Sequence, residues 1–322
     1  MSREYRIPLA RLTALAALVF HVATIASPAA ADHQTTKDLD PSVPSPACRI
    51  SPHFDPSNFG PNSTRIDNLR FPLTPGTQAV FEGRSNRGGG PLPHVVKFTA
   101  TDLTKVIAGV RTLVMYDLDI NEGVLSEAEL AFFAQDNDGN VWNLGEYPEE
   151  YEGKKFVGAP NAWVANPDAG VLPGVHMHAN PVEAAPGTAP YYLQGWVPDI
   201  EFLDCAYVRN IATGNCIPTP SRAGCYHLVT HERSPYDPCV EIPGAPDECP
   251  IQLKYHANGV GIIEIGAIND PEGETLIRTA TVQLDRVAMA QVRRASLRLD
   301  KRAYRTSEVY RTTQPIASAL RR

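Results

Sequence analysis

Two histidines separated by a single residue are the first feature of the sequence that could do chemistry. His176 and His178 stand in "GVLPGVHMHANPVE", and Glu183 follows five residues later. On a β-strand, residues i and i+2 point to the same face, so the two imidazoles could bind one ion together. Neutral imidazoles suit a divalent transition metal such as Zn, Fe or Cu better than Ca or Mg. The alternative is that both rings are ordinary surface or core side chains near a Pro-rich turn.

A catalytic metal site would need a further ligand. His227 in "GCYHLVTH" and His256 in "KYHANGVG" are the candidates for a third imidazole, and Glu183 could complete the shell. Such a site would leave one position open to water or substrate, as catalytic zinc sites do. This pattern predicts a metal-dependent enzyme that acts on a small organic substrate, although the ligand types do not specify the reaction.

A second candidate site lies in "QDNDGNVW". Asp136, Asp138 and Asn140 alternate and could present three oxygens to calcium. An EF-hand loop needs Gly at position 6 and Glu at position 12, and this segment has neither. The alternative is a hairpin turn, because Asp-Gly between two apolar runs is a strong hairpin signal.

The N-terminus has the pattern of a secretory signal peptide. Three arginines precede a short apolar run that ends near "AAA", which predicts cleavage after residue 31 and a secreted or periplasmic protein. No later stretch is long and apolar enough to predict a transmembrane anchor. An even number of cysteines in an exported chain indicates disulfide bonds. The simplest of the possible pairings is Cys48 with Cys205, Cys216 with Cys225, and Cys239 with Cys249.

Short runs rich in Val, Phe, Tyr, Trp and Thr occupy residues 71–285, and Gly, Asn, Asp or Pro bounds each run. Their period is close to two, which predicts an all-β fold: an antiparallel barrel, half-barrel or sandwich. Residues 32–70 are polar and Pro-rich and are expected to form an extended lead-in. A Cys- and Pro-rich insertion is expected at about 205–250. Apolar residues at helical spacing among arginines predict an amphipathic helix within the basic tail, 286–322.

The distribution of charge along the chain indicates which kinds of partner the protein could bind. The chain has a net charge of −7, yet 286–322 holds ten Lys or Arg residues against Asp300 and Glu308, so the body is strongly acidic. An acidic body argues against nucleic acid as a partner. A barrel interior can hold one small ligand, which makes a small molecule the expected partner. Asn62 in "NST" is a glycosylation site only if the host is eukaryotic.

Four sequence blocks together resemble, in the same order, a family of exported, mostly bacterial β-rich proteins with no established activity. The blocks span residues 71–83, 132–146, 173–181 and 254–265. They read "FPLTPGTQAVFEG", "FFAQDNDGNVWNLGE", "PGVHMHANP" and "KYHANGVGIIEI". In that family the last two are closer to P-G-I-I-M-P-A-N-P and K-Y-Y-A-P-G-V-G, so the resemblance implies that the histidines belong to this member. Residues 170–183 also resemble the first metal motif of cupins, but the second cupin motif is not recognisable.

Two functions from different classes are consistent with these patterns. One is an exported barrel-like protein that binds a small molecule or a partner without chemistry. The other is the histidine-ligated metal enzyme.

Overall fold

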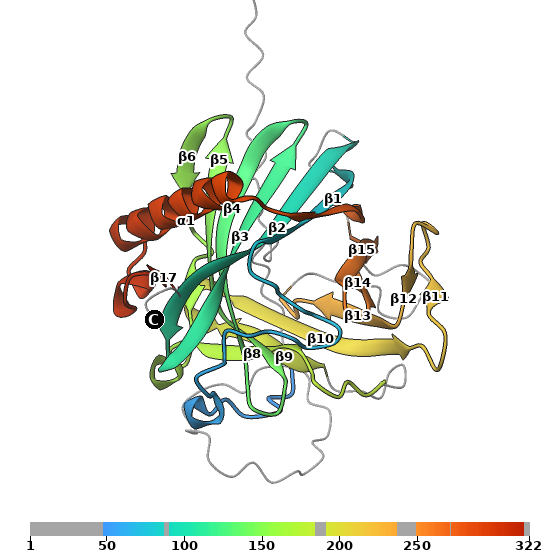
Figure 1. Cartoon of the computed structure of the whole chain (residues 1–322), viewed down its shortest axis with the longest axis horizontal. Coiled ribbons are helices and arrows are strands. Elements are labelled where there is room, and N and C mark those ends of the chain that lie inside the picture. Colours follow the sequence, from blue (N-terminus) through green and yellow to red (C-terminus); the bar gives the residue numbers. More distant parts are fainter. Residues whose placement is uncertain (1–47, 87–89, 184–190, 237–248, 271, 319–322) are drawn as a thin grey trace, which may run out of the picture.

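The computed structural model describes residues 48–86, 90–183, 191–236, 249–270 and 272–318. They form a closed barrel of twelve antiparallel strands with one long helix on its outer surface (Figure 1). The order around the barrel is β1-β16-β15-β14-β13-β10-β9-β8-β5-β4-β3-β2, and pairing of β1 with β2 closes the circle. The predicted all-β class is therefore confirmed, and the architecture is the barrel.

The barrel strands are ten to seventeen residues long between β1 and β5 and shorter in most of the remaining barrel. Their bounds are β1 Thr77–Asn86, β2 Pro91–Ile107, β3 Val110–Asn121, β4 Val124–Gln135, β5 Val141–Glu152, β8 Leu172–Met177, β9 Tyr192–Val197, β10 Phe202–Ile211, β13 Leu228–Arg233, β14 Ile251–Ala257, β15 Gly261–Ile268 and β16 Thr275–Gln283. Short strands β6 Lys155–Gly158 and β7 Trp163–Val164 pair with β5, and β17 Ala317–Ser318 pairs with β2. The hairpin β11 Ile217–Pro218 and β12 Cys225–Tyr226 forms a separate sheet.

Strand β4 shows why its sequence folds this way. Alternate residues point to opposite faces, so Glu127, Glu129, Ala131 and Phe133 share the face that lines the barrel interior. Phe132 belongs to the opposite face and is fully buried. Both faces of β4 are therefore covered.

Helix α1, Arg286–Thr306, lies across the outside of the barrel against β2 and β4 (Figure 1). It begins at Asp285, whose side chain accepts a hydrogen bond from the Ala288 backbone N–H at 2.8 Å and so caps the first turn. Leu299 and Ala303 are buried on one face of the helix. The arginines lie between such residues in the sequence, and none of them is among the buried residues of α1. The predicted amphipathic C-terminal helix is confirmed.

The described part of the lead-in crosses one end of the barrel. The Asn68 side chain donates hydrogen bonds to the backbone oxygens of Gly139 and His178, and the Gly259 backbone N–H donates to Leu69 O. These contacts attach the segment to turns on opposite sides of the barrel. Phe71 follows and enters the interior, so the lead-in closes this end of the barrel.

The expected insertion is shorter than predicted. Strands β10 and β13 fall within its expected bounds, and both belong to the barrel. The Cys- and Pro-rich residues between them, 212–227, leave the barrel as the β11–β12 hairpin. Residues 237–248 lie outside the described part of the chain.

Two of the predicted disulfides are present. Cys48 pairs with Cys205, which fastens the lead-in to the outside of β10, and Cys216 pairs with Cys225 across the β11–β12 hairpin. Cys249 is also disulfide-bonded, and its predicted partner, Cys239, is not among the described residues. No cysteine of the described residues is free.

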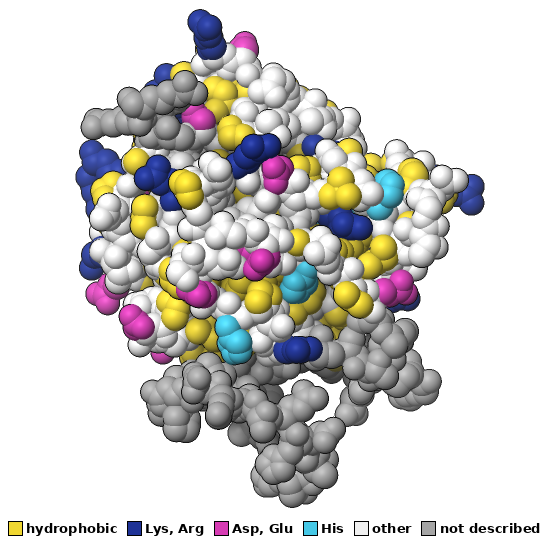
Figure 2. Space-filling view, turned by 60° about the horizontal axis from the view of Figure 1, so that its bottom comes forward, with side chains coloured by type: hydrophobic (Ala, Val, Ile, Leu, Met, Phe, Trp, Pro, Cys, Tyr) yellow, Lys and Arg dark blue, Asp and Glu magenta, His cyan; other side chains and the backbone are white. Residues whose placement is uncertain are grey.

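The barrel end that lies at the bottom of Figure 1 has a mixed surface. Figure 2 turns it forward and shows acidic side chains dispersed among hydrophobic ones, with Lys and Arg side chains gathered along the left edge. Within the described ranges, no helix has the length and apolar composition needed to cross a membrane. The predicted signal peptide, residues 1–31, lies outside those ranges.

Candidate functional site

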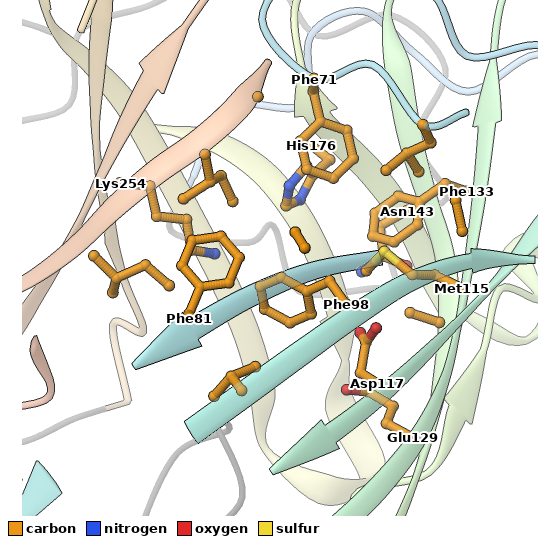
Figure 3. A pocket seen from close by; sticks show the side chains of 18 of the residues that line it. Phe71, Phe81, Phe98, Met115, Asp117, Glu129, Phe133, Asn143, His176 and Lys254 are labelled. Atoms are coloured by element: carbon orange, nitrogen blue, oxygen red, sulfur yellow. The ribbon is translucent and has the colours of Figure 1, made fainter. Parts of the chain in front are cut away.

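The barrel encloses a cavity of about 380 Å³. Cavities of roughly 300–1,000 Å³ are the usual size for small-molecule sites. Figure 3 shows Phe71 and His176 at one end, Phe81 and Phe98 along the middle, and a group of polar side chains at the other end. The cavity therefore combines an aromatic wall with a group of carboxyl groups at one end, and further polar side chains, such as Lys254 and Gln194, also line it.

The apolar wall comes from segments distant in sequence. Phe81 of β1 packs against Phe98 of β2 with ring centroids 5.3 Å apart, and Phe71 packs against Phe133 of β4 at 5.4 Å. The first pair is edge-to-face and the second is tilted, and aromatic rings prefer such geometries to face-to-face stacking. Met115 of β3 adds a flexible thioether to the wall.

The acidic end is built on β3, β4 and β5. Asp117 lies opposite Glu129 in the antiparallel register, and Asp119 lies opposite Glu127 two residues further along, on the same face. Directly opposed residues have Cβ atoms about 4.5–5.5 Å apart, where like charges are destabilising. Two neighbouring cross-strand pairs on one face of β3 and β4 thus carry two carboxyl groups each.

Burial makes these carboxyl groups difficult to ionise. The pKa of Asp117 lies well above its usual value, first because the side chain is removed from water and then because Glu127 and Glu146 are close. The pKa of Glu129 is raised in the same way, with Glu146 and Glu127 as its strongest charged neighbours. The Asp117 side chain is only 6% exposed, and its Oδ1 has no hydrogen-bond partner.

Glu146 is held more firmly than its neighbours. The Asn143 amide donates to its Oε1 at 2.6 Å, and the Trp163 indole donates to its Oε2 at 3.2 Å. Burial nevertheless raises its pKa. Gly145, with φ +148°, permits the Trp163 contact, because a Cβ there would lie 2.6 Å from the Trp163 carbonyl oxygen.

The opposite wall carries a neutralised pair. Lys254 of β14 and Glu232 of β13 form an ion pair at 2.5 Å. Although burial opposes both charges, the lysine lowers the pKa of Glu232, and the carboxylate raises the pKa of Lys254. The positive charge of Lys254 is therefore committed mainly to Glu232.

His176 lines the cavity, but as an aromatic side chain. Its ring lies 4.3 Å from the ring of Phe71 and 5.1 Å from that of Phe133. Burial is the main reason that its pKa falls to about 3, so the ring is neutral at physiological pH. Strand β8 ends at Met177, and His178 beyond it packs against Tyr192 at 4.5 Å.

The other predicted metal ligands have partners in the chain. The His256 Nδ1 contacts Arg70 O at 3.1 Å, and the His227 Nδ1 accepts a hydrogen bond from the Asn258 backbone. Glu183 accepts one from the backbone of Ile211. His256 is near enough to His176 to lower its pKa, yet the described part of the chain holds no group of three His, Cys, Asp or Glu side chains that could hold a metal. The predicted ligand set is not assembled.

The candidate calcium residues form the turn between β4 and β5. Asp136 Oδ1 accepts hydrogen bonds from the backbone N–H groups of Asp138 and Asn140, and its Oδ2 accepts from the Trp142 indole at 2.8 Å. Gly139 has the positive φ that the turn requires. These contacts give the residues the structural role that was the alternative to calcium binding. Asn62 is exposed in a turn before the barrel.

Sequence reasoning missed the acidic end of the cavity. Asp117, Glu129, Glu146 and Lys254 were not candidates, although one signal was present. Glu127 and Glu129 lie an even number of residues before Ala131 and Phe133. The two-residue period of a strand therefore places the two carboxylates on the same face as Phe133.

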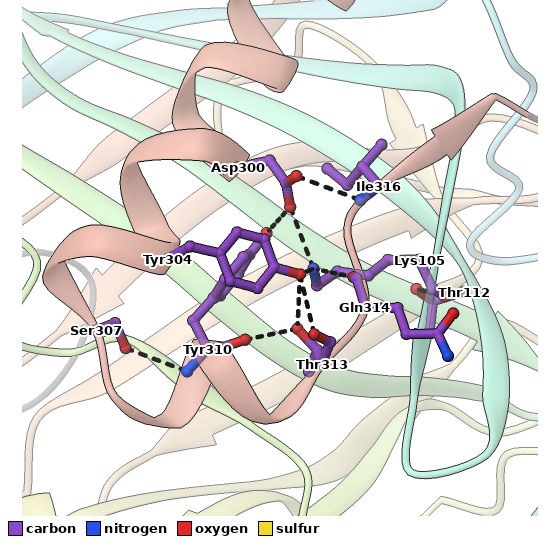
Figure 4. A network of polar contacts seen from close by, with 9 residues as sticks. All are labelled: Lys105, Thr112, Asp300, Tyr304, Ser307, Tyr310, Thr313, Gln314 and Ile316. Carbon is purple, nitrogen blue, oxygen red and sulfur yellow. Dashed lines mark hydrogen bonds and ion pairs between the residues drawn. The ribbon is translucent and has the colours of Figure 1, made fainter.

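A separate buried ionic cluster attaches α1 to the barrel (Figure 4). Lys105 Nζ donates hydrogen bonds to Asp300 Oδ1 at 3.1 Å, to the Tyr304 hydroxyl at 2.9 Å and to Gln314 O at 2.7 Å. Burial lowers the pKa of Lys105 to about 8, although Asp300 acts in the opposite direction. The contacts link β2 to the helix and the C-terminal segment, so this cluster is structural.

The fold and the cavity define a closed antiparallel barrel with a ligand-sized interior. No family model matches the chain, and no curated protein matches it. Among solved structures, it is similar to a candidate lipoprotein from Parabacteroides distasonis at 13% identity. That match covers 67% of this chain and 96% of the other, with a TM-score of 0.26, and supports no argument about function.

Proposed function

We propose that this protein is an exported barrel that binds a small, mostly apolar organic molecule in its interior. The cavity supports this proposal: it has the volume of a ligand site, an aromatic wall, and polar groups that include the carboxyl groups gathered at one end. Such a combination is typical of small-molecule sites. The disulfide bonds support export, because they persist in oxidising compartments.

The metal-dependent enzyme has less support. Its proposed histidines are hydrogen-bonded or packed against aromatic rings, and no set of three ligands is present in the described ranges. The charged groups that line the cavity are carboxyl groups, the Lys254–Glu232 ion pair and Arg278, and amide side chains accompany them. Binding without a resident metal is therefore the function that we propose.

A cavity-filling substitution tests this proposal. Ala131 lines the cavity, so Ala131→Trp should fill it and abolish binding of the neutral fluorophore N-phenylnaphthylamine. Ala280→Trp places the same side chain at an exposed position of β16 and should leave binding unchanged. Fluorescence titration measures both variants. Wild-type protein that fails to bind the fluorophore, or an Ala131→Trp variant that still binds it, would contradict the proposal.

A further inference from the structure

We propose that the ligand is an organic cation, with an apolar body among the phenylalanines and an ammonium group held between Asp117 and Glu129. This inference rests on the proposed function and names the chemical class of its ligand. It follows from the arrangement of charge, apolar surface and an unpartnered oxygen within one cavity.

The first observation is the pairing of like charges. Asp117 and Glu129 are directly opposed on β3 and β4 and both line the cavity. Lys254 acts on Glu129 from across the barrel, but its ion-pair partner is Glu232. A bound cation between the two opposed carboxyl groups would convert their repulsion into two charge-assisted hydrogen bonds.

The second observation is a missing hydrogen bond. Asp117 Oδ1 is buried and has no hydrogen-bond partner. The backbone of Thr99 forms a hydrogen bond with the same carboxyl group, but that bond leaves Oδ1 unpaired. Buried polar atoms in proteins are nearly always paired, so an orphan oxygen that faces a cavity indicates a missing donor. An ammonium group has three N–H donors and no acceptor, which matches an end of the cavity that is rich in acceptors.

The third observation is the distribution of polarity along the cavity. Phe81 and Phe98 stand between the acidic end and the end that Phe71 closes (Figure 3). A molecule that spans the cavity would therefore place apolar groups against these rings and a polar group at the acidic end. Aromatic faces also attract cations, so the wall does not oppose entry of a positive group.

The groups that face Asp117 determine how binding depends on pH. They are Glu127 and Glu129 on β4, Glu146 on β5, Asp119 on its own strand, and, from the far wall, Lys254 with Glu232. His94 of β2 contacts Asp119 and Glu274 near the same end. Carboxylic acids dominate this set, and the pKa values of Asp117 and Glu129 are raised. An entering ammonium group would therefore displace a carboxyl proton to solvent.

Three probes of one shape test the inference: phenylbutylamine, phenylbutanol and phenylbutyrate. Isothermal titration calorimetry with wild-type protein should show the amine binding at least tenfold more tightly than the alcohol, and the carboxylate binding least. Repeating the amine titration in buffers of different ionisation enthalpy should show proton release. The amine affinity should rise between pH 5 and 7, as the carboxyl groups become easier to ionise.

Matched variants assign the effect to the carboxyl pair. Asp117→Asn and Glu129→Gln should each weaken amine binding about tenfold or more and leave alcohol binding within about twofold. Glu82→Gln removes an exposed carboxylate from β1 and should change neither. Amine and alcohol binding equally, or amine binding that is insensitive to both variants, would overturn the cation proposal and leave the binding function standing. Failure of all three probes while N-phenylnaphthylamine binds would also overturn it, and failure of every probe would overturn both proposals.

Discussion

Asp117 and Glu129 lie directly opposite each other on neighbouring strands, and both face the cavity rather than solvent. Such a buried arrangement is unfavourable, because Asp117 makes Glu129 harder to ionise, while Glu127 and Glu146 have the same effect on Asp117. Ordinary packing would be served better by apolar residues such as the phenylalanines and Met115 of the same cavity. The pair is therefore the feature of the fold that most strongly points to a ligand.

The stability of the ligand-free protein should reveal this unfavourable arrangement. The folded-state pKa of Asp117 lies above its unfolded value, so its contribution to stability is full below about pH 4 and is lost as the pH rises. Asp117→Asn removes the ionisable group and should stabilise the protein at pH 7 by on the order of 1–3 kcal/mol. Urea unfolding at pH 4 and pH 7 measures the difference. An equal effect at the two pH values would contradict the assignment.

His256 should make the free energy of unfolding depend on pH in the opposite direction. Burial is the main reason that its folded-state pKa lies near 4, below the unfolded value of about 6.5. The unfolded state then binds more protons between these values, so stability falls as the pH drops from 6.5 towards 4, by on the order of 3 kcal/mol. His256→Asn should flatten this part of the stability profile, while His53→Asn, at an exposed position, should not. Parallel profiles for wild type and His256→Asn would refute this prediction.

Lys105 should be essential for attachment of α1. Lys105→Met leaves the carboxylate of Asp300 buried without its cation, and breaking such a pair from one side costs about 3–5 kcal/mol. The double variant Lys105→Met/Asp300→Asn should recover part of that loss. Arg293→Ala, also on α1, breaks a partly exposed ion pair with Asp102 of β2 and should cost at most about 1 kcal/mol. Denaturant unfolding compares the three, and equal losses for Lys105→Met and Arg293→Ala would argue against a structural role for the cluster.

The two described disulfides should differ in their effect on stability. Cys48–Cys205 closes a loop with a sequence separation of 157, and Cys216–Cys225 one of only 9. Loop-closure entropy predicts losses of about 5 and about 2.5 kcal/mol, respectively, when each pair is replaced by alanine. Thermal unfolding of the two double variants tests this order. A larger loss for the short loop would contradict it.

Much of the fold could be predicted from local sequence. The alternation of β4, the Asp-Gly turn after it and the apolar spacing of α1 are each properties of fewer than about twenty consecutive residues. The pairing of Cys216 with Cys225 follows from proximity in the chain. Closure of the barrel is different, because β1 must pair with β16, which lies about two hundred residues away. No local pattern distinguishes a closed barrel from a sandwich.

The site was harder to predict for two physical reasons. The outer face of β4 is covered by α1, so Phe132 is as apolar as the inward-facing Phe133, and the alternation did not reveal which face held the carboxyl groups. The two-residue spacing of His176 and His178 has meaning only within a strand, and β8 ends between them. Both features depend on where elements end or pack, which the sequence does not state.

A crystal structure of the protein with phenylbutylamine tests the central claim most directly. The account predicts ligand density inside the barrel, with the ring near Phe81 and Phe98 and the ammonium nitrogen at hydrogen-bond distance, about 2.7–3.2 Å, from Asp117 Oδ1. Density for the amine only on the outer surface, or an interior that holds nothing but ordered water at saturating amine, would contradict it.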